Sequence, residues 1–254
     1  MIDNRIRTVL VTGASSGIGQ AFCRLLATKN CDLILVARRE DRLLELQREL
    51  DGVSGCVKSV VADLSMIEGI AQISDVIRQR APIDLLINSA GSSAFGSFAD
   101  SNLSRQIAVT RIQIDATLAM TRGVLPFMRA QSFGRIINVS SVGAFLSMKR
   151  TAVYGATKAF LNSFSRSLNE EESQYGIKIQ CLCPGMTKTE IHDSIEFAGF
   201  DKTRVPDDMW MTPEQVAEFS LAALETERVF VIPGAQNLDL VSKDLAEQRR
   251  LLQK

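Results

Sequence analysis

The sequence lacks a net charge and contains a single histidine. Its 254 residues include 29 basic and 29 acidic side chains, so no overall field attracts a nucleic acid or an anionic membrane. His192 alone cannot build a metal cluster, and no carboxylate or cysteine stands at metal-ligand spacing from it. We therefore predict no metal, no nucleic-acid partner and a small-molecule ligand, with His192 as a solvated residue.

Long apolar runs are also missing. No stretch approaches the roughly 20 residues that a membrane helix requires, and the opening MIDNRIRTVLVTG leads almost directly into a predicted strand. The cysteines are odd in number and scattered through apolar runs, which favours buried free thiols in a reducing compartment. We predict no membrane association and a cytoplasmic location. The five cysteines are Cys23, Cys31, Cys56, Cys181 and Cys183.

Internal repeats, low-complexity tracts and Pro/Gly-rich linkers are absent as well. Short β-branched apolar runs alternate with segments whose apolar residues recur at helical spacing. The runs show no polar alternation, which is typical of strands buried on both faces of a parallel sheet. We predict one domain over 1–254, an α/β doubly wound fold with a seven-stranded, mostly parallel sheet and helices on both faces. The predicted strands are 7–12, 32–37, 57–62, 84–88, 135–140, 177–182 and 228–233.

A glycine-rich turn, TGASSGIGQ, follows the first predicted strand. Gly13, Gly17 and Gly19 open the next helix, and glycine permits the tight turn that brings backbone close to a pyrophosphate at a helix N-terminus. A plain strand-to-helix loop is the alternative. The position at the first such junction favours a dinucleotide site.

Tyr154 and Lys158 stand four residues apart in TAVYGATKAF. On a helix they share one face. A cation beside a phenol lowers the phenol pKa from its ordinary value near 10, so the tyrosine can exchange a proton at neutral pH. The alternative is an ordinary surface pair on an amphipathic helix.

Five motifs occur in order along the chain and identify a family. They are TGASSGIG at 12–19, NSAG at 88–91, a serine thirteen residues before Tyr154, YGATK at 154–158 and PGMTKT at 184–189. Together they resemble the short-chain dehydrogenase/reductase family over essentially the whole chain. The resemblance implies a Rossmann fold and an oxidoreductase that interconverts a carbonyl and an alcohol with a nicotinamide cofactor.

The resemblance assigns the catalytic roles. Tyr154 is expected to protonate the substrate carbonyl oxygen as hydride arrives from the nicotinamide, and Lys158 to lower the tyrosine pKa and bind the nicotinamide ribose. Ser141 is expected to hold the carbonyl oxygen, while Ser140 keeps a strand-end structural role. Gln113 stands where the family usually has asparagine, so the proton relay either survives in shifted form or is compromised.

The end of the second strand indicates the cofactor. An acidic residue there would favour NAD, but Ala37 is followed by Arg38 and Arg39, whose guanidinium groups suit the 2′-phosphate of NADP(H). Ser15 could add a hydrogen bond to that phosphate. Two solvated arginines are the alternative.

The remaining cofactor residues follow from the resemblance, each with a structural alternative. Asp63 is expected at the adenine edge or as a helix N-cap. Asn88 either contacts the cofactor or only stabilises the sheet, and Ser89 and Thr187 depart from the commoner family residues. The predicted cofactor-binding residues are Gly13, Ser15, Ser16, Gly17, Ile18, Gly19, Arg38, Arg39, Asp63, Leu64, Asn88, Ala90, Gly91, Tyr154, Lys158, Pro184, Gly185, Thr187 and Thr189.

Two C-terminal segments remain. Residues 186–211 are predicted to form a lid, and their apolar side chains suit a hydrophobic ketone or aldehyde or simply pack on the sheet. These side chains are Phe197, Phe200, Met209, Trp210 and Met211. Residues 238–254 read as an amphipathic helix that docks on its own domain or on another subunit. By resemblance we expect a homo-oligomer, either a dimer or a tetramer.

The sequence thus predicts an NADPH-dependent reductase or alcohol dehydrogenase that acts on CH–OH groups, with Ser141, Tyr154, Lys158 and Gln113 at its catalytic centre. The competing hypothesis is a non-enzymatic NADP(H)-binding sensor or regulatory protein on the same fold, and Gln113 is its motivation.

Overall fold

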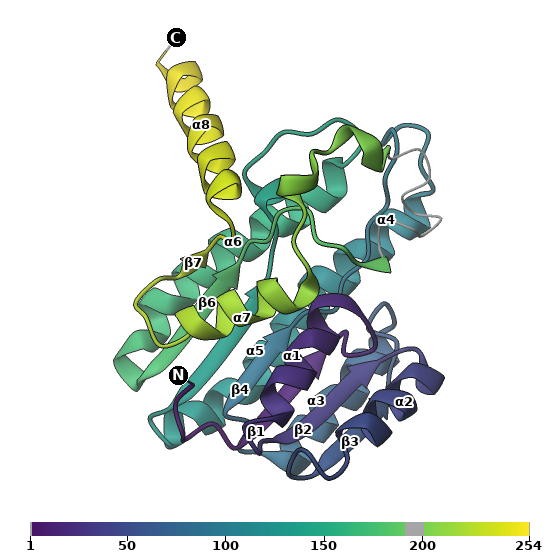
Figure 1. Cartoon of the computed structure of the whole chain (residues 1–254), viewed down its shortest axis with the longest axis vertical. Coiled ribbons are helices and arrows are strands. Elements are labelled where there is room, and N and C mark those ends of the chain that lie inside the picture. Colours follow the sequence, from purple (N-terminus) through teal and green to yellow (C-terminus); the bar gives the residue numbers. More distant parts are fainter. Residues whose placement is uncertain (1, 191–200, 254) are drawn as a thin grey trace.

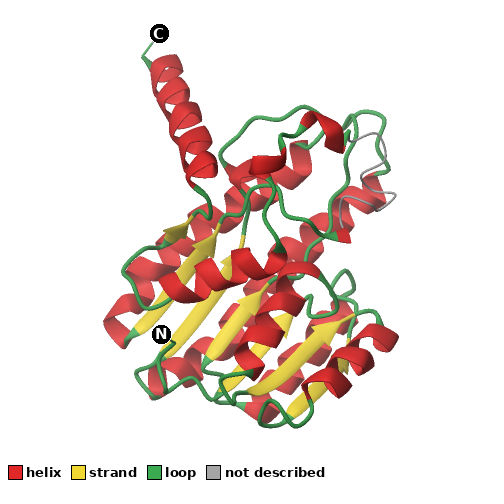
Figure 2. Cartoon of the chain, viewed as in Figure 1, coloured by secondary structure: helices red, strands yellow, loops and turns green. Residues whose placement is uncertain are grey.

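The computed structural model describes residues 2–190 and 201–253. Among these residues, seven strands form one sheet in the order β3-β2-β1-β4-β5-β6-β7, and every neighbouring pair is parallel. The predicted doubly wound Rossmann-type fold is confirmed (Figure 2). The strands are β1 (Thr8–Thr12), β2 (Asp32–Ala37), β3 (Val57–Val61), β4 (Leu85–Asn88), β5 (Gly134–Val139), β6 (Ile177–Leu182) and β7 (Phe230–Val231).

Helices cover both faces of the sheet (Figure 1). On one face α1, α2 and α7 pack on alternate strand residues, around Phe22, Leu43 and Val216. On the other face α3, α5 and α6 close a second core around Ile73 and Met120. The helices are α1 (Gly17–Ala27), α2 (Glu40–Leu50), α3 (Ile67–Arg80), α4 (Leu103–Thr110), the π-helical turn η1 (Arg111–Asp115), α5 (Ala116–Ala130), α6 (Ala152–Glu172), α7 (Pro213–Ala223) and α8 (Ala235–Leu252).

The strand bounds agree closely with the apolar runs, except at the sheet edge. All six residues of β5 are buried, as expected for a central strand of a parallel sheet, and they include Arg135 and Asn138 beside the apolar side chains. The run predicted at 228–233 yields only Phe230 and Val231 as strand. Pro233 has no N–H to donate, and β7 pairs on one side only, so nothing extends the ladder there.

The strand order reverses between β1 and β4. From β1 the chain builds outward to β2 and β3, then returns to add β4 and the rest on the other side. The hydroxyl of Thr12, the last residue of β1, accepts hydrogen bonds from the backbone N–H groups of Ser89 (3.1 Å) and Ala90 (3.0 Å). The two strands therefore end level at the switch point, where ligands of such folds bind.

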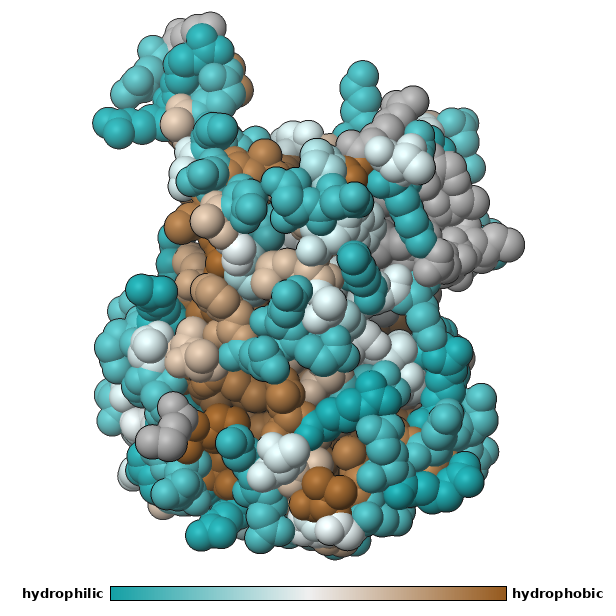
Figure 3. Space-filling view, in the orientation of Figure 1, coloured by the Kyte–Doolittle hydropathy of each residue, from teal (hydrophilic) through white to brown (hydrophobic). Residues whose placement is uncertain are grey.

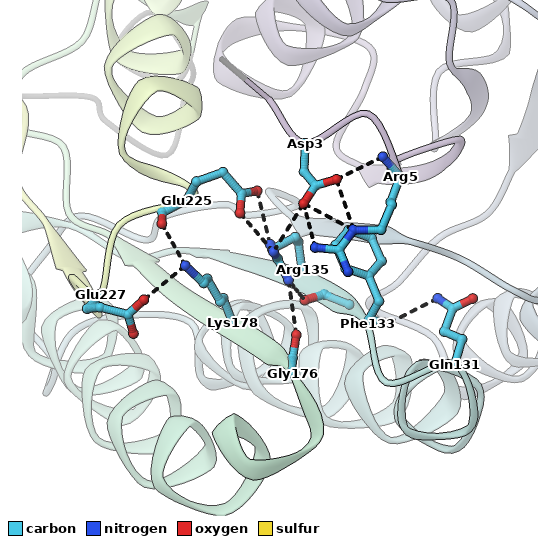
Figure 4. Close-up of polar contacts among 10 residues, drawn as sticks. Asp3, Arg5, Gln131, Phe133, Arg135, Gly176, Lys178, Glu225 and Glu227 are labelled. Carbon is cyan, nitrogen blue, oxygen red and sulfur yellow. Dashed lines mark hydrogen bonds and ion pairs between the residues drawn. The ribbon is translucent and has the colours of Figure 1, made fainter.

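At the opposite end of the strands from the switch point, a network of charged side chains joins several segments (Figure 4). Arg135, the second residue of β5, is 2% exposed and donates Nε and Nη2 to the two carboxylate oxygens of Glu225, at 3.0 and 2.8 Å. Its guanidinium stacks on Phe133 at 4.4 Å, and Arg5 stacks on the same ring at 4.1 Å. Asp3 pairs with Arg5 and lies 3.9 Å from Arg135. The N-terminal segment is thereby tied to β5 and to the chain beyond α7.

The C-terminal helix α8 projects from the body (Figure 1). Only Asn237 and Val241 in it are buried, and Figure 3 shows mostly polar side chains along its length. Gln248 still reaches the carbonyl of Phe145, at 2.9 Å. The helix therefore docks on its own domain through its first turns and through the later contact of Gln248. None of the helices in residues 2–190 and 201–253 combines the length and apolarity needed to cross a bilayer.

The five cysteines are free thiols. Four are buried as predicted, but Cys56 is exposed. It lies in the loop before β3, where its backbone N–H donates to the Asp32 carboxylate at 2.7 Å. The residue is therefore outside the buried strand that follows it.

Candidate active site

A cavity of about 670 Å³ lies beyond the carboxyl ends of the strands. Segments that follow β1 through β6 line it, and the first turns of α8 add to its wall. The volume is within the range of small-molecule and cofactor sites, roughly 300 to 1,000 Å³. This position is the one that the doubly wound topology predicts for a ligand.

The glycine turn shapes one wall. Gly13 has φ of +70°, and a Cβ there would lie 2.9 Å from the backbone of Ala90, so only glycine fits between β1 and β4. Helix α1 begins at Gly17 after Ser16, whose side chain makes no capping bond. The first N–H groups of α1 thus lack a side-chain cap where the turn faces the cavity, an arrangement that suits a phosphate.

The Ser16 hydroxyl instead joins a basic corner at the end of β2. Arg39 donates Nη2 to the hydroxyls of Ser15 (3.2 Å) and Ser16 (2.7 Å) and Nη1 to the Glu190 carboxylate (2.8 Å). Arg38 lies 3.9 Å from Asp63. Both arginines line the cavity, so this corner can bind an anion through guanidinium and hydroxyl donors.

Asp63 also lines the cavity. Burial raises the pKa of its carboxyl, but hydrogen bonds from the N–H and hydroxyl of Ser65, at 2.9 and 2.7 Å, and the charge of Arg38 outweigh burial and lower the pKa overall. Helix α3 begins at Ile67 with Met66 as its N-cap. The alternative in which Asp63 caps that helix is therefore wrong.

Tyr154 and Lys158 lie one turn apart on α6, as their spacing predicts. Lys158 Nζ is 5.7 Å from the centre of the Tyr154 ring and donates a 2.8 Å hydrogen bond to the carbonyl of Val139, the last residue of β5. Ser141 lies two residues beyond the end of β5, and its Oγ accepts from the N–H of Gly143 at 3.0 Å. Ser140 is buried and donates to the Lys158 carbonyl at 3.0 Å, so it braces α6 against the strand.

The ionisation of this group departs from the prediction. Burial raises the pKa of Tyr154, and a hydrogen bond with Ser141 only partly offsets it. Burial likewise lowers the pKa of Lys158 to about 8, against the charges of Cys181 and Cys183. The predicted lowering of the tyrosine pKa by Lys158 is not seen, because desolvation dominates while the ammonium faces the Val139 carbonyl.

Gln113 lies on the π-helical turn η1 and lines the same cavity. Its Nε2 donates to the Ser92 carbonyl at 2.6 Å, and its Oε1 accepts from the Thr157 hydroxyl at 2.9 Å. A Cβ on Gly91 would lie 3.8 Å from Gln113 Nε2 and 3.9 Å from Lys158 Nζ. The glutamine therefore ties the loop after β4 to α6 immediately beside the lysine.

The structure gathers all but two of the predicted site residues around the cavity. Gly19 lies inside the turn, where a Cβ would meet the Gly13 carbonyl oxygen at 2.4 Å. Asn88 is turned away, and its Nδ2 donates to Asn138 Oδ1 at 2.8 Å and to the Thr121 hydroxyl at 3.3 Å. For Asn88 the geometry is that of the sheet-stabilising alternative.

The predicted lid is described only in part. His192, Phe197 and Phe200 lie outside the described residues. Met209 lines the cavity, whereas Met211 packs on the core and its N–H donates to the Met186 carbonyl at 2.9 Å. Packing on the sheet, the alternative reading, thus applies to Met211.

Several lining residues were not predicted. Glu190 follows the PGMTKT motif, and its position next to Thr189 was the available signal. Asn237 and Leu240 come from α8, whose sequence indicates an amphipathic helix but not its proximity to the site. Apolar side chains complete the wall. They are Phe95, Leu146, Met148 and Val205.

Comparison with known proteins agrees with this geometry. A family model described as short chain dehydrogenase matches residues 7–197. An uncharacterized oxidoreductase of Staphylococcus epidermidis is 35% identical over 191 residues, which cover 75% of this chain and 82% of the relative. An uncharacterized oxidoreductase of Staphylococcus aureus is 30% identical over 219 residues, 86% of this chain and 90% of the relative.

Solved structures are similar over nearly the full length. A short-chain dehydrogenase from Sphingobium yanoikuyae in complex with NADPH has a TM-score of 0.85 and 32% identity, covering 96% of this chain and 94% of the other. A bulky-bulky ketone specific alcohol dehydrogenase from Comamonas testosteroni has a TM-score of 0.81 and 26% identity, covering 98% and 94%. With the motifs, the topology and the family match in agreement, the chain belongs to the short-chain dehydrogenase family of oxidoreductases.

Proposed function

We propose that the protein is an NADPH-dependent oxidoreductase that interconverts a ketone or aldehyde and an alcohol. The observation that carries this proposal is that Ser141, Tyr154 and Lys158 line one cavity together with the glycine turn and the Arg38–Arg39 corner. A proton donor and a nucleotide-binding turn in one cavity are what carbonyl reduction by a nicotinamide cofactor requires.

The residues fit NADP(H) on structural grounds. Gly13 and Gly17 allow close backbone approach, and the N-terminus of α1 lacks a side-chain cap. Arg38 and Arg39, with the Ser15 hydroxyl, would hold the 2′-phosphate, and Ala37 places no acid there to oppose it. The NADPH bound to the similar Sphingobium enzyme supports this assignment. When bound, the cofactor supplies a hydride to the carbonyl carbon.

The chain's own residues would manage the proton. The Tyr154 hydroxyl donates its proton to the carbonyl oxygen, and its raised pKa keeps it protonated at neutral pH. Ser141 positions the same oxygen through its hydroxyl. Lys158 holds a positive charge beside the ring, which favours the phenolate left after transfer. Gln113 secures the loop and helix that frame this group.

The substrate proposal follows from the wall opposite these polar groups. Phe95, Leu146, Met148, Val205 and Met209 give the cavity an apolar lining that fits a hydrophobic ketone or aldehyde. The similar Comamonas enzyme is specific for bulky-bulky ketones, which supports the same class here. We further propose that residues 186–211 act as a lid over this part of the cavity.

We also propose that the chain works as a single domain, as a homo-oligomer and in the cytoplasm. By resemblance, family members associate through α6 and the long helix before β5, and Leu103, Ile107 and Leu118 are exposed on α4 and α5 of that long helix. The buried free thiols suit a reducing compartment.

The test is consumption of NADPH across a panel of small, aromatic, steroid-like and acyl-thioester carbonyls. Tyr154→Phe should lower turnover by about 10²- to 10⁴-fold while NADPH still binds. The only other tyrosine, Tyr175, is exposed, and Tyr175→Phe is the matched control that should leave turnover unchanged. Full activity in Tyr154→Phe would refute the mechanism. NADPH binding without turnover of any carbonyl would favour the non-enzymatic sensor instead.

A further inference from the structure

Glu190, from the segment after β6, places an acidic side chain at the basic corner formed by Arg38 and Arg39. Its carboxylate accepts from Arg39 Nη1 at 2.8 Å through one oxygen and from Arg42 Nη1 through the other. The residue follows Thr189 in the segment after β6, whereas both arginines lie at the start of α2. An acid 151 residues away in the chain thus sits where Arg39 also meets Ser15 and Ser16.

The carboxylate holds one edge of the guanidinium that a 2′-phosphate needs. Nη1 of Arg39 is committed to Glu190, while Nε and Nη2 contact the serine hydroxyls. Bidentate binding of phosphate uses two adjacent N–H groups of one guanidinium fork. A phosphate entering this corner must therefore displace Glu190 from Arg39 or accept a carboxylate as a close neighbour.

The charge of Glu190 persists at neutral pH. Hydrogen bonds from Arg39 and Arg42 lower the pKa of its carboxyl, so the group stays ionised. Its side chain is 50% exposed, so its ion pair with Arg39 is weak enough for a phosphate to displace the carboxylate. The pair is still strong enough for the carboxylate to compete with that phosphate for Arg39.

We propose that Glu190 is a cofactor-specificity residue that competes with the 2′-phosphate of NADPH for Arg39. The inference rests on the proposed function, since it deepens the assignment of this corner to NADP(H). A free 2′-hydroxyl, as in NADH, carries no charge for Glu190 to repel and can donate a hydrogen bond to the carboxylate. Glu190 therefore narrows the preference for NADPH over NADH that Arg38 and Arg39 create.

Glu190 in effect supplies the acid missing from the end of β2. Dinucleotide sites that select NAD carry an acidic residue at that strand end, where this chain has Ala37. Here a carboxylate reaches the same corner from the segment after β6 and stands opposite the arginines. The site thus combines a phosphate-binding element with a ribose-binding element from a different strand.

The test measures dissociation constants of NADPH and NADH for the full-length protein by calorimetry. Glu190→Gln should bind NADPH about three- to tenfold more tightly than wild type, because exposed charge pairs of this kind are worth up to about one power of ten. NADH should bind no more tightly. The gain for NADPH should shrink at high salt, which screens exposed charges.

Glu49→Gln is the matched control. It removes the same charge from a comparable pair with Arg24, at 2.7 Å, outside the cavity, and should change neither constant. Adenosine 2′,5′-bisphosphate and adenosine 5′-monophosphate serve as probes that confine the effect to the 2′-phosphate.

The outcomes separate the two proposals. Wild-type protein that binds no NADPH would contradict the proposed function itself. Wild type that binds NADPH, with Glu190→Gln no tighter or with NADPH and NADH tightened equally, would overturn only the role of Glu190.

Discussion

A buried cation lies at each end of strand β5, Arg135 of the strand itself and Lys158 of α6, and only one of the two is paired with a carboxylate. Arg135 near its start is 2% exposed and is paired with Glu225 through both carboxylate oxygens. Lys158 lies against its last residue, is 6% exposed and donates to the Val139 carbonyl. Within the part of the chain that the structure describes, no carboxylate lies within ion-pair distance of Lys158.

The contrast separates stability from function within one strand. A buried cation that binds a carboxylate through both oxygens is compensated, and removal of the cation leaves the carboxylate as an unpaired charge. A buried cation without one remains destabilising, and burial lowers the pKa of Lys158 to about 8 as a result. An uncompensated charge of this kind is typical of a functional site, because a ligand or a transferred proton can use it.

The largest effect expected is the loss of activity in Lys158→Met. Turnover should fall by about 10³-fold, since the variant lacks the charge beside Tyr154. Its free energy of unfolding at about pH 7 should nevertheless rise by roughly 1–2 kcal/mol, because the buried charge is gone. Urea unfolding of the ligand-free protein checks the second part. A variant that is both inactive and less stable than wild type would contradict the view that the charge of Lys158 is destabilising in the ligand-free protein.

Arg135→Met should give the reverse pattern. It leaves the Glu225 carboxylate without its bidentate partner, and the free energy of unfolding should fall by about 2–4 kcal/mol. The surviving folded protein should keep its kcat/KM, since Arg135 does not line the cavity.

Arg5→Met is the matched control for Arg135→Met. Arg5 stacks on the same Phe133 ring and pairs with Asp3, but its side chain is 62% exposed. Its replacement should lower stability far less than Arg135→Met does, because an exposed ion pair contributes little. Equal losses in the two variants would show that stacking on Phe133, and not the buried ion pair, holds this end of the sheet.

The strands could be predicted from the sequence because local patterns encode them. The largely apolar run of β5, which shows no polar alternation, predicts a strand buried on both faces, and the spacing of Tyr154 and Lys158 predicts one helix face. The ion pairs at the amino end of β5 and at the basic corner are not local. Arg135 and Glu225 are 90 residues apart, and Arg39 and Glu190 are 151 apart. No periodicity links such positions, so only the assembled fold reveals them.

Asn88 and the tyrosine pKa illustrate a second limit. A motif names the residue types at a site, but not the direction in which each side chain points. Asn88 belongs to the NSAG motif and yet bonds to Asn138, because the two residues are partners in the register of β4 and β5 and their amides meet. The direction of the Tyr154 shift depended on how far burial outweighs a neighbouring charge, which spacing alone does not give.

Gln113 offers a sharper test of the functional end, because its amide is already satisfied there. Gln113→Asn should lower kcat/KM by about tenfold, since the shorter side chain cannot span the Ser92 carbonyl and the Thr157 hydroxyl together. Thr157→Val, which removes one of the two contacts, should give part of the same loss. A gain in kcat/KM for Gln113→Asn would show instead that glutamine impairs the relay.

The smallest effect is a pH dependence of stability that belongs to Lys158. Burial lowers its folded pKa from 10.5 to about 8, so between these values the unfolded chain binds more protons than the folded one. Stability contributed by this group therefore rises with pH through that window. Buried thiols such as Cys23, whose pKa is raised by burial, act in the opposite direction, because they keep protons that the unfolded chain releases.

The difference between wild type and Lys158→Met removes the contribution of thiols such as Cys23, whose pKa does not depend on Lys158, since both proteins share it. The stability advantage of the variant should shrink by about 1 kcal/mol as pH rises from about 7 to 9. Parallel urea titrations at each pH measure this difference. An advantage that stays constant over the range would mean that the Lys158 amine keeps its proton in the folded protein, and that the carboxyl end of β5 compensates its cation as fully as the amino end does.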